Sequence, residues 1–322
     1  MRPIVLFTVS SLSLSSLMMA AEAQNWPARP LQVIVPIGPG GPTDIIPRVV
    51  FEQLAPQLGQ TIVVENRPGA GGTLGAAFVA KAAPDGYTAL ANGSGHAIAP
   101  ALFQDLSYHP TRDFAAVTPF CTSASVLVVP PGSGLSTPGE LVAAGKAKSG
   151  GLNFASVGAG TFTHLSAERF LASAGVRAVH VPFKGGPAAM AEVMTGRIDF
   201  FFGPISLVAS QVREAKLTAL AVNGTQRSGL LPDVPTLSEA GFADAEYPVW
   251  FGLFLPAKTP RPVVDKLYNE TQKALRTTQV REKLVGHGCE PMHMTPDEFD
   301  AFVEKEIALN AALIKAVGLQ PQ

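Results

Sequence analysis

Short apolar runs alternate with helical patterns along most of the chain. In the first half, glycine-containing loops follow the apolar runs at 31–35, 61–64 and 87–91. The same alternation returns in the second half, with runs at 126–129, 152–155, 178–181, 198–202 and 218–222. Continuous apolar strands that alternate with amphipathic helices are typical of a parallel sheet covered by helices on both faces. The pattern therefore predicts an α/β protein.

The last third of the chain changes character. After an apolar run at 250–255, helical patterns dominate at 262–276 and 296–316, with little sheet of their own to cover. The simplest arrangement returns these helices to the first half. We therefore expect a two-lobed α/β fold, each lobe a mainly parallel sheet, with chain crossings near 118–125 and 247–252. The first lobe would comprise 24–122 plus 249–322, and the second 123–248.

The N-terminus is typical of an export signal. Arg2 precedes an apolar, serine-rich stretch, and Ala21 and Ala23 place small residues at the positions that a signal peptidase reads. A membrane anchor is the alternative, but the stretch is short for a bilayer span and is interrupted by serines. We expect a signal peptide over 1–23, a mature chain that begins near Gln24, and a periplasmic location.

Composition and charge exclude several classes of function. The chain of 322 residues has a net charge of −1 and 15% charged residues, without a dense run of Lys and Arg, so we expect no nucleic-acid partner. Neither a complete dinucleotide fingerprint nor a phosphate loop is present, so we expect no cofactor. The six histidines show no metal-ligand spacing, so we expect no metal. The spacing of Cys121 and Cys289 assigns no pairing, and we expect buried free thiols, with a disulfide as the alternative.

The candidate ligand site lies in loops at the carboxyl ends of the predicted strands, where open parallel sheets bind ligands. A glycine loop that opens a helix presents unpaired N–H groups and a positive dipole end, and it binds an anion without Lys or Arg. In the first such loop, Gly40, Gly41 and Pro42 shape the backbone. The Thr43 hydroxyl binds ligand or caps the helix, and for Asp44 we favour capping.

Further candidates follow the later strands. Ser94 lies in the loop after the third strand, and in the second half Gly158, Gly160 and Thr161 precede the helix of His164. The His164 side chain faces the cleft or, equally, a helix surface or interlobe contact. Three more candidates are Phe183, Gly185 and Asp199, of which Asp199 accepts from the ligand or from loop amides. We expect Gly41 and Gly160 to need backbone conformations that a Cβ disfavours, and Lys184 to be solvated.

The ordered motifs resemble those of the substrate-binding subunits of tripartite tricarboxylate transporters, the TctC or Bug family. The resemblance covers essentially all of the expected mature chain and is carried by PGGPTD at 39–44, VENRPGAGG at 64–72, PDGYT at 84–88, GAGT at 158–161, VPFKGG at 181–186, GRID at 196–199 and LPDVPT at 231–236. Each motif alone is weak, but their order and spacing together are specific.

The resemblance implies a periplasmic two-lobed fold that closes around its ligand. It implies a carboxylate held largely by backbone amides and ordered water, and delivery to a membrane permease of two subunits. The chain departs from the family pattern at Phe183, where Tyr is usual, and at Asn310, near a common Trp. We expect a monomeric, non-enzymatic receptor for a small carboxylate: a dicarboxylate, tricarboxylate, aromatic acid or amino acid.

Two alternatives to a transport receptor remain at this point. The protein could present its ligand to a membrane sensor kinase, which neighbouring genes would reveal. It could instead be a secreted enzyme acting on a small acid, which requires titratable groups in the cleft. The candidates for that role are His164, Asp44 and Asp199.

Overall fold

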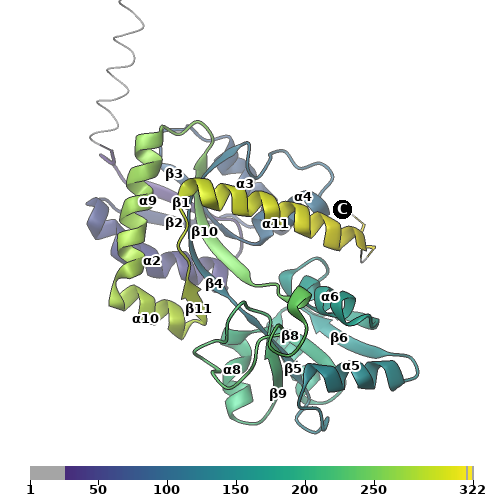
Figure 1. The fold of residues 1–322 in the computed structure, drawn as a ribbon. Coiled ribbons are helices and arrows are strands. Elements are labelled where there is room, and N and C mark those ends of the chain that lie inside the picture. The colour runs from purple at the N-terminus through teal and green to yellow at the C-terminus, as the bar shows by residue number, and fades with distance from the viewer. Residues whose placement is uncertain (1–25, 317, 321–322) are drawn as a thin grey trace, which may run out of the picture.

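The computed structural model describes residues 26–316 and 318–320, and the expected signal peptide lies outside these residues. Two α/β lobes, one above the other in Figure 1, confirm the predicted fold class. In the described part of the chain, no helix is long and apolar enough to cross a membrane.

The first lobe is built on a six-stranded sheet of order β11-β4-β10-β3-β1-β2. Its strands are β1 (Leu31–Val35), β2 (Ile62–Asn66), β3 (Thr88–Gly93), β4 (Phe114–Ser123), β10 (Val249–Pro256) and β11 (Cys289–Pro291). Its helices are α2 (Pro42–Leu58), α3 (Thr73–Ala80), α4 (Gly95–Leu102), α9 (Arg261–Arg276), α10 (Thr278–Gly286) and α11 (Pro296–Ala316). The C-terminal helices thus return to the first lobe.

The second lobe is built on a five-stranded sheet of order β7-β6-β8-β5-β9. Its strands are β5 (Ser125–Val129), β6 (Leu152–Ser156), β7 (Ala178–Pro182), β8 (Phe200–Pro204) and β9 (Thr218–Val222). Its helices are α5 (Pro138–Ala147), α6 (Phe162–Ala174), α7 (Gly186–Met194) and α8 (Ile205–Arg213).

Both sheets are mainly parallel, with reversals at the crossings. In the first sheet β1 to β4 run one way, while β10 and β11 run antiparallel to their neighbours. In the second sheet β5 alone runs against β6 to β9. The reversed strands arise because the chain enters the second lobe from β4 and leaves it into β10.

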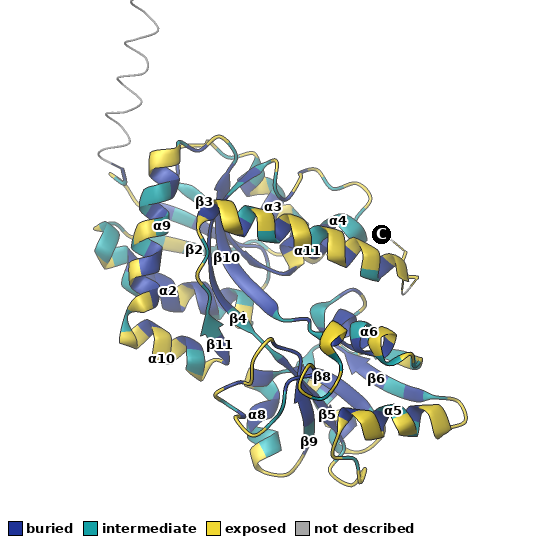
Figure 2. Ribbon diagram, in the orientation of Figure 1, coloured by how far each residue is buried: buried dark blue, intermediate teal, exposed yellow. Residues whose placement is uncertain are grey.

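Apolar strands supply the cores of both lobes. Every residue of β5 and of β10 is buried, and Figure 2 shows β10 in the colour of buried residues as it runs from the first lobe toward the second. Helices cover the sheets on both faces, so these strands read as continuous apolar runs rather than as alternating ones. The sequence pattern was informative for this reason.

Asn223, which follows β9, ties the two crossing segments together. Its side-chain oxygen accepts a hydrogen bond from the Ser125 amide at 2.6 Å, and its amide group donates to the Tyr247 carbonyl at 2.8 Å and to Ser166 Oγ at 3.0 Å. Its backbone bonds to the same two crossing segments, at Ser125 and Tyr247. Asn223 is fully buried, so these bonds fix the hinge in a water-excluded place.

Helix α11 reaches from the first lobe toward the second. It packs on α4 and contacts α6, and its C-terminal end lies beside both helices in Figure 1. Asn310 on α11 accepts a hydrogen bond from the Tyr247 hydroxyl. Asn310 is fully buried, so this is a buried polar contact with the hinge.

Cys121 and Cys289 form a disulfide, so the expectation of free thiols is wrong. The two residues lie on the neighbouring strands β4 and β11, which brings their Cα atoms to 5.6 Å. Residues so distant in sequence gave no geometric reason to pair, and only the sheet order supplies one. The bond closes the chain around the whole second lobe.

Removing this disulfide should lower stability. We expect the C121A/C289A variant to lose about 2–5 kcal/mol of unfolding free energy, because the bond restricts the unfolded chain over a long loop. Urea unfolding of the wild type and of the variant measures the difference. Reductant should lower the stability of the wild type and leave that of the variant unchanged, so the variant is the control for reductant. Alkylation of thiols in the unreduced, denatured wild type would contradict the pairing.

Candidate functional site

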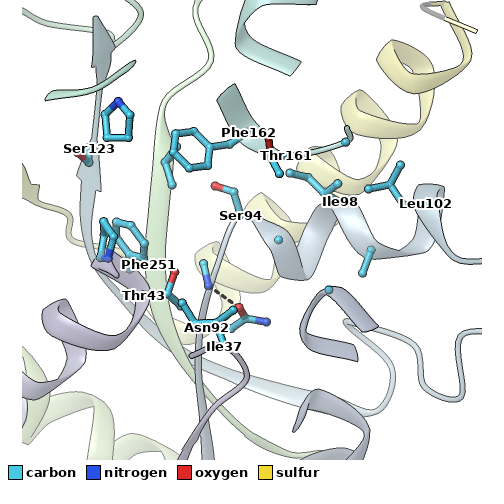
Figure 3. Close-up of a pocket in the computed structure, with 18 of the residues that line it drawn as sticks. Ile37, Thr43, Asn92, Ser94, Ile98, Leu102, Ser123, Thr161, Phe162 and Phe251 are labelled. Carbon is cyan, nitrogen blue, oxygen red and sulfur yellow. Dashed lines mark hydrogen bonds between the residues drawn. The ribbon is translucent and has the colours of Figure 1, made fainter. Parts of the chain in front are cut away.

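A cavity of about 460 Å³ lies between the two lobes at the hinge. Both lobes line it, together with residues that follow α11, as Figure 3 shows in part. Its wall includes Ile37, Pro42, Thr43, Ile46, Ala70, Gly71, Asn92, Gly93, Ser94, Gly95, Ile98, Ala99, Leu102, Phe103, Ser123, Ala124, Ala159, Gly160, Thr161, Phe162, Pro204, Ser206, Val249, Phe251, His287, Cys289, Leu319 and Gln320.

The N-termini of four helices meet at this cavity. The first residues of α2, α4, α6 and α8, or the residues that precede them, are all part of its wall. None of these four N-termini has a side-chain cap hydrogen bond. First-turn N–H groups that bond nothing else can bind another acceptor, although in α8 the Ile205 amide already donates to the Ala124 carbonyl at 3.2 Å. Their dipoles together favour a negative charge in the cavity.

Charged side chains are missing from the described wall. No Lys, Arg, Asp or Glu is among its lining residues, and His287, which is exposed at the rim, is the one imidazole among them. A buried anion would therefore be neutralised by backbone dipoles and hydroxyl groups rather than by an ion pair. In the described residues no cluster of three or more potential metal ligands is present either.

Three polar side chains of the first lobe carry donors at the centre of the cavity (Figure 3). Ser94 Oγ accepts from the Trp250 amide at 3.0 Å, which leaves its hydroxyl proton for a ligand. Asn92 Oδ1 accepts from the Gly93 amide at 2.9 Å, which leaves its NH₂ group. The Thr43 hydroxyl makes no hydrogen bond to another described residue, so it too can bind a ligand.

The rest of the wall is apolar. Ile98 and Leu102 extend along α4 away from Ser94 in Figure 3, and Phe251 and Ile37 close other sides. Leu319, beyond α11, adds a further apolar side chain. The cavity therefore offers polar donors near its centre and apolar surface around them, a combination typical of sites for small organic ligands.

The first predicted loop is held in shape by Asp44. Its carboxylate accepts from the Gly40 amide at 3.0 Å, from Arg48 at 2.8 Å and from Asn66 at 2.9 Å. Burial raises the pKa of Asp44, but these hydrogen bonds and the Arg48 charge outweigh burial and leave the pKa lowered. Asp44 supports the loop from behind and does not line the cavity. It does not cap α2 either, because its carboxylate bonds the Gly40 amide before the helix, so the favoured capping role is wrong.

The structure brings together only part of the predicted set. Pro42, Thr43, Ser94, Gly160 and Thr161 line the cavity. Gly40, Gly41, Gly158 and His164 lie in or behind the loops that carry them, and Phe183 and Gly185 do not line the wall. The Gly160 amide donates to His164 Nδ1 at 3.0 Å, so Gly160 supplies wall rather than a donor.

Asp199 lies at the other end of its strand. It precedes β8, and its carboxylate contacts Lys148 Nζ at 2.8 Å and the Asn153 amide at 2.8 Å. The ligand loops follow the carboxyl ends of the strands, so Asp199 is remote from them. The apolar residues after Asp199 correctly indicated a strand. Asp199 lies before the start of that strand, at the end away from the cleft, and therefore does not line the cavity.

Several residues that line the cavity were not among the candidates predicted from the sequence. Asn92 stands directly before the predicted Gly93-Ser94 loop, and its position there was the available signal. Ile98, Leu102 and Phe162 belong to the apolar faces of helices, where a core position and a cavity position look alike. Only the meeting of the two lobes distinguishes them.

Comparison with known proteins identifies the kind of molecule. Residues 46–319 match the model of the "Tripartite tricarboxylate transporter family receptor". The chain is 36% identical to the "UPF0065 protein in tcbD-tcbE intergenic region" of Pseudomonas sp. (strain P51), over 86% of this chain and 83% of that protein.

Two solved structures are similar throughout. MatC from Rhodopseudomonas palustris with bound malate has a TM-score of 0.75 and 32% identity, over 90% of this chain and 100% of that chain. The R. palustris protein Rpa4515 with adipate has a TM-score of 0.80 and 28% identity, over 92% of this chain and 100% of that chain.

Two α/β lobes joined by paired crossings, with a cavity between them, define a solute-binding protein of the periplasmic type. This chain belongs to the TctC family, the receptors of tripartite tricarboxylate transporters. The fold and the family are those of solute-binding proteins rather than of enzymes.

The two loop glycines that we expected to behave alike differ. Gly160 has φ +72°, and a Cβ there would lie 2.6 Å from Leu102 Cδ1 across the lobes. Gly41 has φ −87°, which any residue adopts, and a Cβ there would meet only Ile37 at 3.7 Å. The expectation was therefore wrong for Gly41, whereas its neighbour Gly40 does have a positive φ, +89°.

We expect G160A to lower the unfolding free energy by about 1–2 kcal/mol, because alanine disfavours the left-handed conformation. The matched G41A variant should stay within about 0.5 kcal/mol of the wild type. Urea unfolding followed by circular dichroism compares the two. Equal losses in both variants would show that neither φ nor the Leu102 contact matters.

Proposed function

We propose that the protein captures a small carboxylate in the interlobe cavity and delivers it to a tripartite tricarboxylate-type permease. The observation that carries the proposal is the meeting of four helix N-termini without side-chain caps at a cavity whose described wall contains no Lys, Arg, Asp or Glu. Such a cavity attracts an anion. Similar structures with malate and adipate support the carboxylate class.

The apolar wall refines the ligand class. A tricarboxylate would place three charges in a cavity that has no Lys or Arg in its described wall. Burying a charge without an adequate partner is costly. We therefore propose a ligand with one or two carboxylates and an apolar body, such as an aliphatic dicarboxylate or an aromatic acid, rather than citrate.

A thermal-shift panel tests both levels of the proposal. A ligand that binds only the native state raises the melting temperature by mass action. We expect adipate or benzoate to raise it more than citrate at equal concentration. No response to any mono-, di- or tricarboxylate would count against the carboxylate class, whereas a response to citrate alone would count against the apolar body.

Thr43 and Lys184 provide a matched pair for the binding mode. T43V removes a cavity hydroxyl while keeping the side-chain shape. We expect it to weaken binding of the acid by about one to two decades, because a hydrogen bond to a charged group is worth about 1.5–3 kcal/mol. K184A removes an exposed charge that does not line the cavity, so its affinity should change by less than about threefold. Calorimetry with the best acid from the panel compares them. Loss of binding in K184A, with unchanged affinity in T43V, would show that a salt bridge rather than helix dipoles holds the carboxylate.

We also propose that the protein is exported and processed after Ala23, on the basis of the N-terminal pattern and of a family whose members include periplasmic proteins. Intact mass of the protein recovered from periplasmic extract should correspond to a chain that begins near Gln24. Recovery with Met1 in place would refute the processing.

A further inference from the structure

Two imidazoles stack directly behind the second-lobe loop that lines the cavity. His164, in the first turn of α6, and His180, on β7, have ring centroids 3.8 Å apart and an interplanar angle of 9°. Both rings also stack near Phe154 of β6. His164 is 3% exposed and does not touch the cavity. The function proposed above uses neither ring.

His164 fixes one end of the loop. The Gly160 amide donates to His164 Nδ1 at 3.0 Å. An N–H donor needs a lone pair opposite, so Nδ1 carries no proton and the proton of the neutral ring is on Nε2. Nε2 lies 3.4 Å from Glu168 Oε1, one turn further along α6. The ring is thereby oriented so that its acceptor faces the loop.

His180 fixes the other end through Ser156. His180 Nε2 lies 2.6 Å from Ser156 Oγ. Ser156 Oγ also accepts from the Gly158 amide at 3.0 Å and lies 3.0 Å from the Gly158 carbonyl, to which it can donate. A proton on His180 Nε2 satisfies all three contacts at once. The loop 156–161 is thus held at both ends by neutral imidazoles.

The surroundings favour the neutral form of His180. Burial and, to a smaller extent, the nearby His164 lower the pKa of His180 to about 4, although Glu168 acts in the opposite direction. Within the described chain, the titratable groups that face the pair are the two rings themselves and Glu168. The remaining contacts, Phe154 and Ser156 from β6, do not titrate in this range.

We propose that the His164–His180 pair positions the second-lobe binding loop, and that a proton on His164 releases it. Protonated Nδ1 becomes a donor and faces the Gly160 N–H, so the hydrogen bond is lost and two donors repel each other. The proton comes from solvent, and no covalent bond changes. Because Gly160 and Thr161 form part of the cavity wall, acidification would weaken ligand retention. That last step rests on the proposed function.

Amide hydrogen exchange of Gly160, followed by NMR on ¹⁵N-labelled protein, tests the positioning without any ligand. After correction for the intrinsic rate, we expect protection in the wild type at pH 7.5 and an approximately tenfold loss as the pH falls toward 5. H164A should lack this protection at every pH. H164N should keep it throughout, because Asn Oδ1 replaces the acceptor and does not titrate.

H180Q gives an independent readout. Gln can still donate to Ser156, and because His180 is neutral in this pH range, its replacement removes no charge from beside His164. Protection of Gly160 should therefore be lost over the same pH range as in the wild type. Circular dichroism confirms that each variant is folded. Wild-type protection that is independent of pH, or equal protection in H164A and the wild type, would overturn the inference.

Calorimetry with adipate and with malate at pH 7.5 and 5.5 extends the test to binding. We expect affinity to fall at the lower pH in the wild type by more than in H164N. Equal pH dependence in the two proteins would remove the link between the pair and ligand retention. Failure of both acids to bind, with the exchange results as expected, would refute the carboxylate function and leave the positioning role standing.

Discussion

The two-lobed arrangement depends on one buried side chain at the hinge. Asn223 satisfies its carbonyl and its NH₂ group on Ser125, Tyr247 and Ser166, and so it joins both crossing segments to α6. A buried amide with every group paired fixes a unique geometry, because any displacement leaves a polar group without a partner. The cavity forms beside this point, and its shape depends on how the crossings are held.

The cavity gains its preference for anions from backbone rather than from side chains. Four helices begin at its wall, and each brings partial positive charge without the reach and flexibility of Lys or Arg. Dipoles of this kind are fixed before a ligand arrives, so little ordering accompanies binding. In the function that we propose, the surrounding apolar residues would discriminate between acids by the shape of their uncharged part. The field of the helix dipoles is diffuse, whereas the hydrogen-bond donors on Thr43, Asn92 and Ser94 are directional.

The sequence predicted the helices and strands better than it predicted which of them lie side by side. Fully buried strands such as β10, and glycine loops before helices, carry local signals, so the fold class and half of the cavity loops could be read directly. Relations across the sheet had no such signal. The Cys121–Cys289 bond needs β11 beside β4. For Asp199 the sequence left two roles open, and the structure shows the contact with a backbone amide, that of Asn153, rather than a place in the cavity wall. Leu102 and Phe162 line the cavity only because the two lobes meet there.

The chain leaves the first lobe through β4 and returns to it through the adjacent strand β10. Ser123 at the end of β4 is paired with Val249 at the start of β10, so the two junctions lie side by side. In the order of the chain the second lobe is inserted between β4 and β10, at a place where a short hairpin turn would also fit. Recombination between relatives could exchange residues 124–248 as one cassette, together with Asn223 and the histidine pair. One wall of the cavity would change while the other stayed, which offers a modular route to new ligands without a redesign of either core.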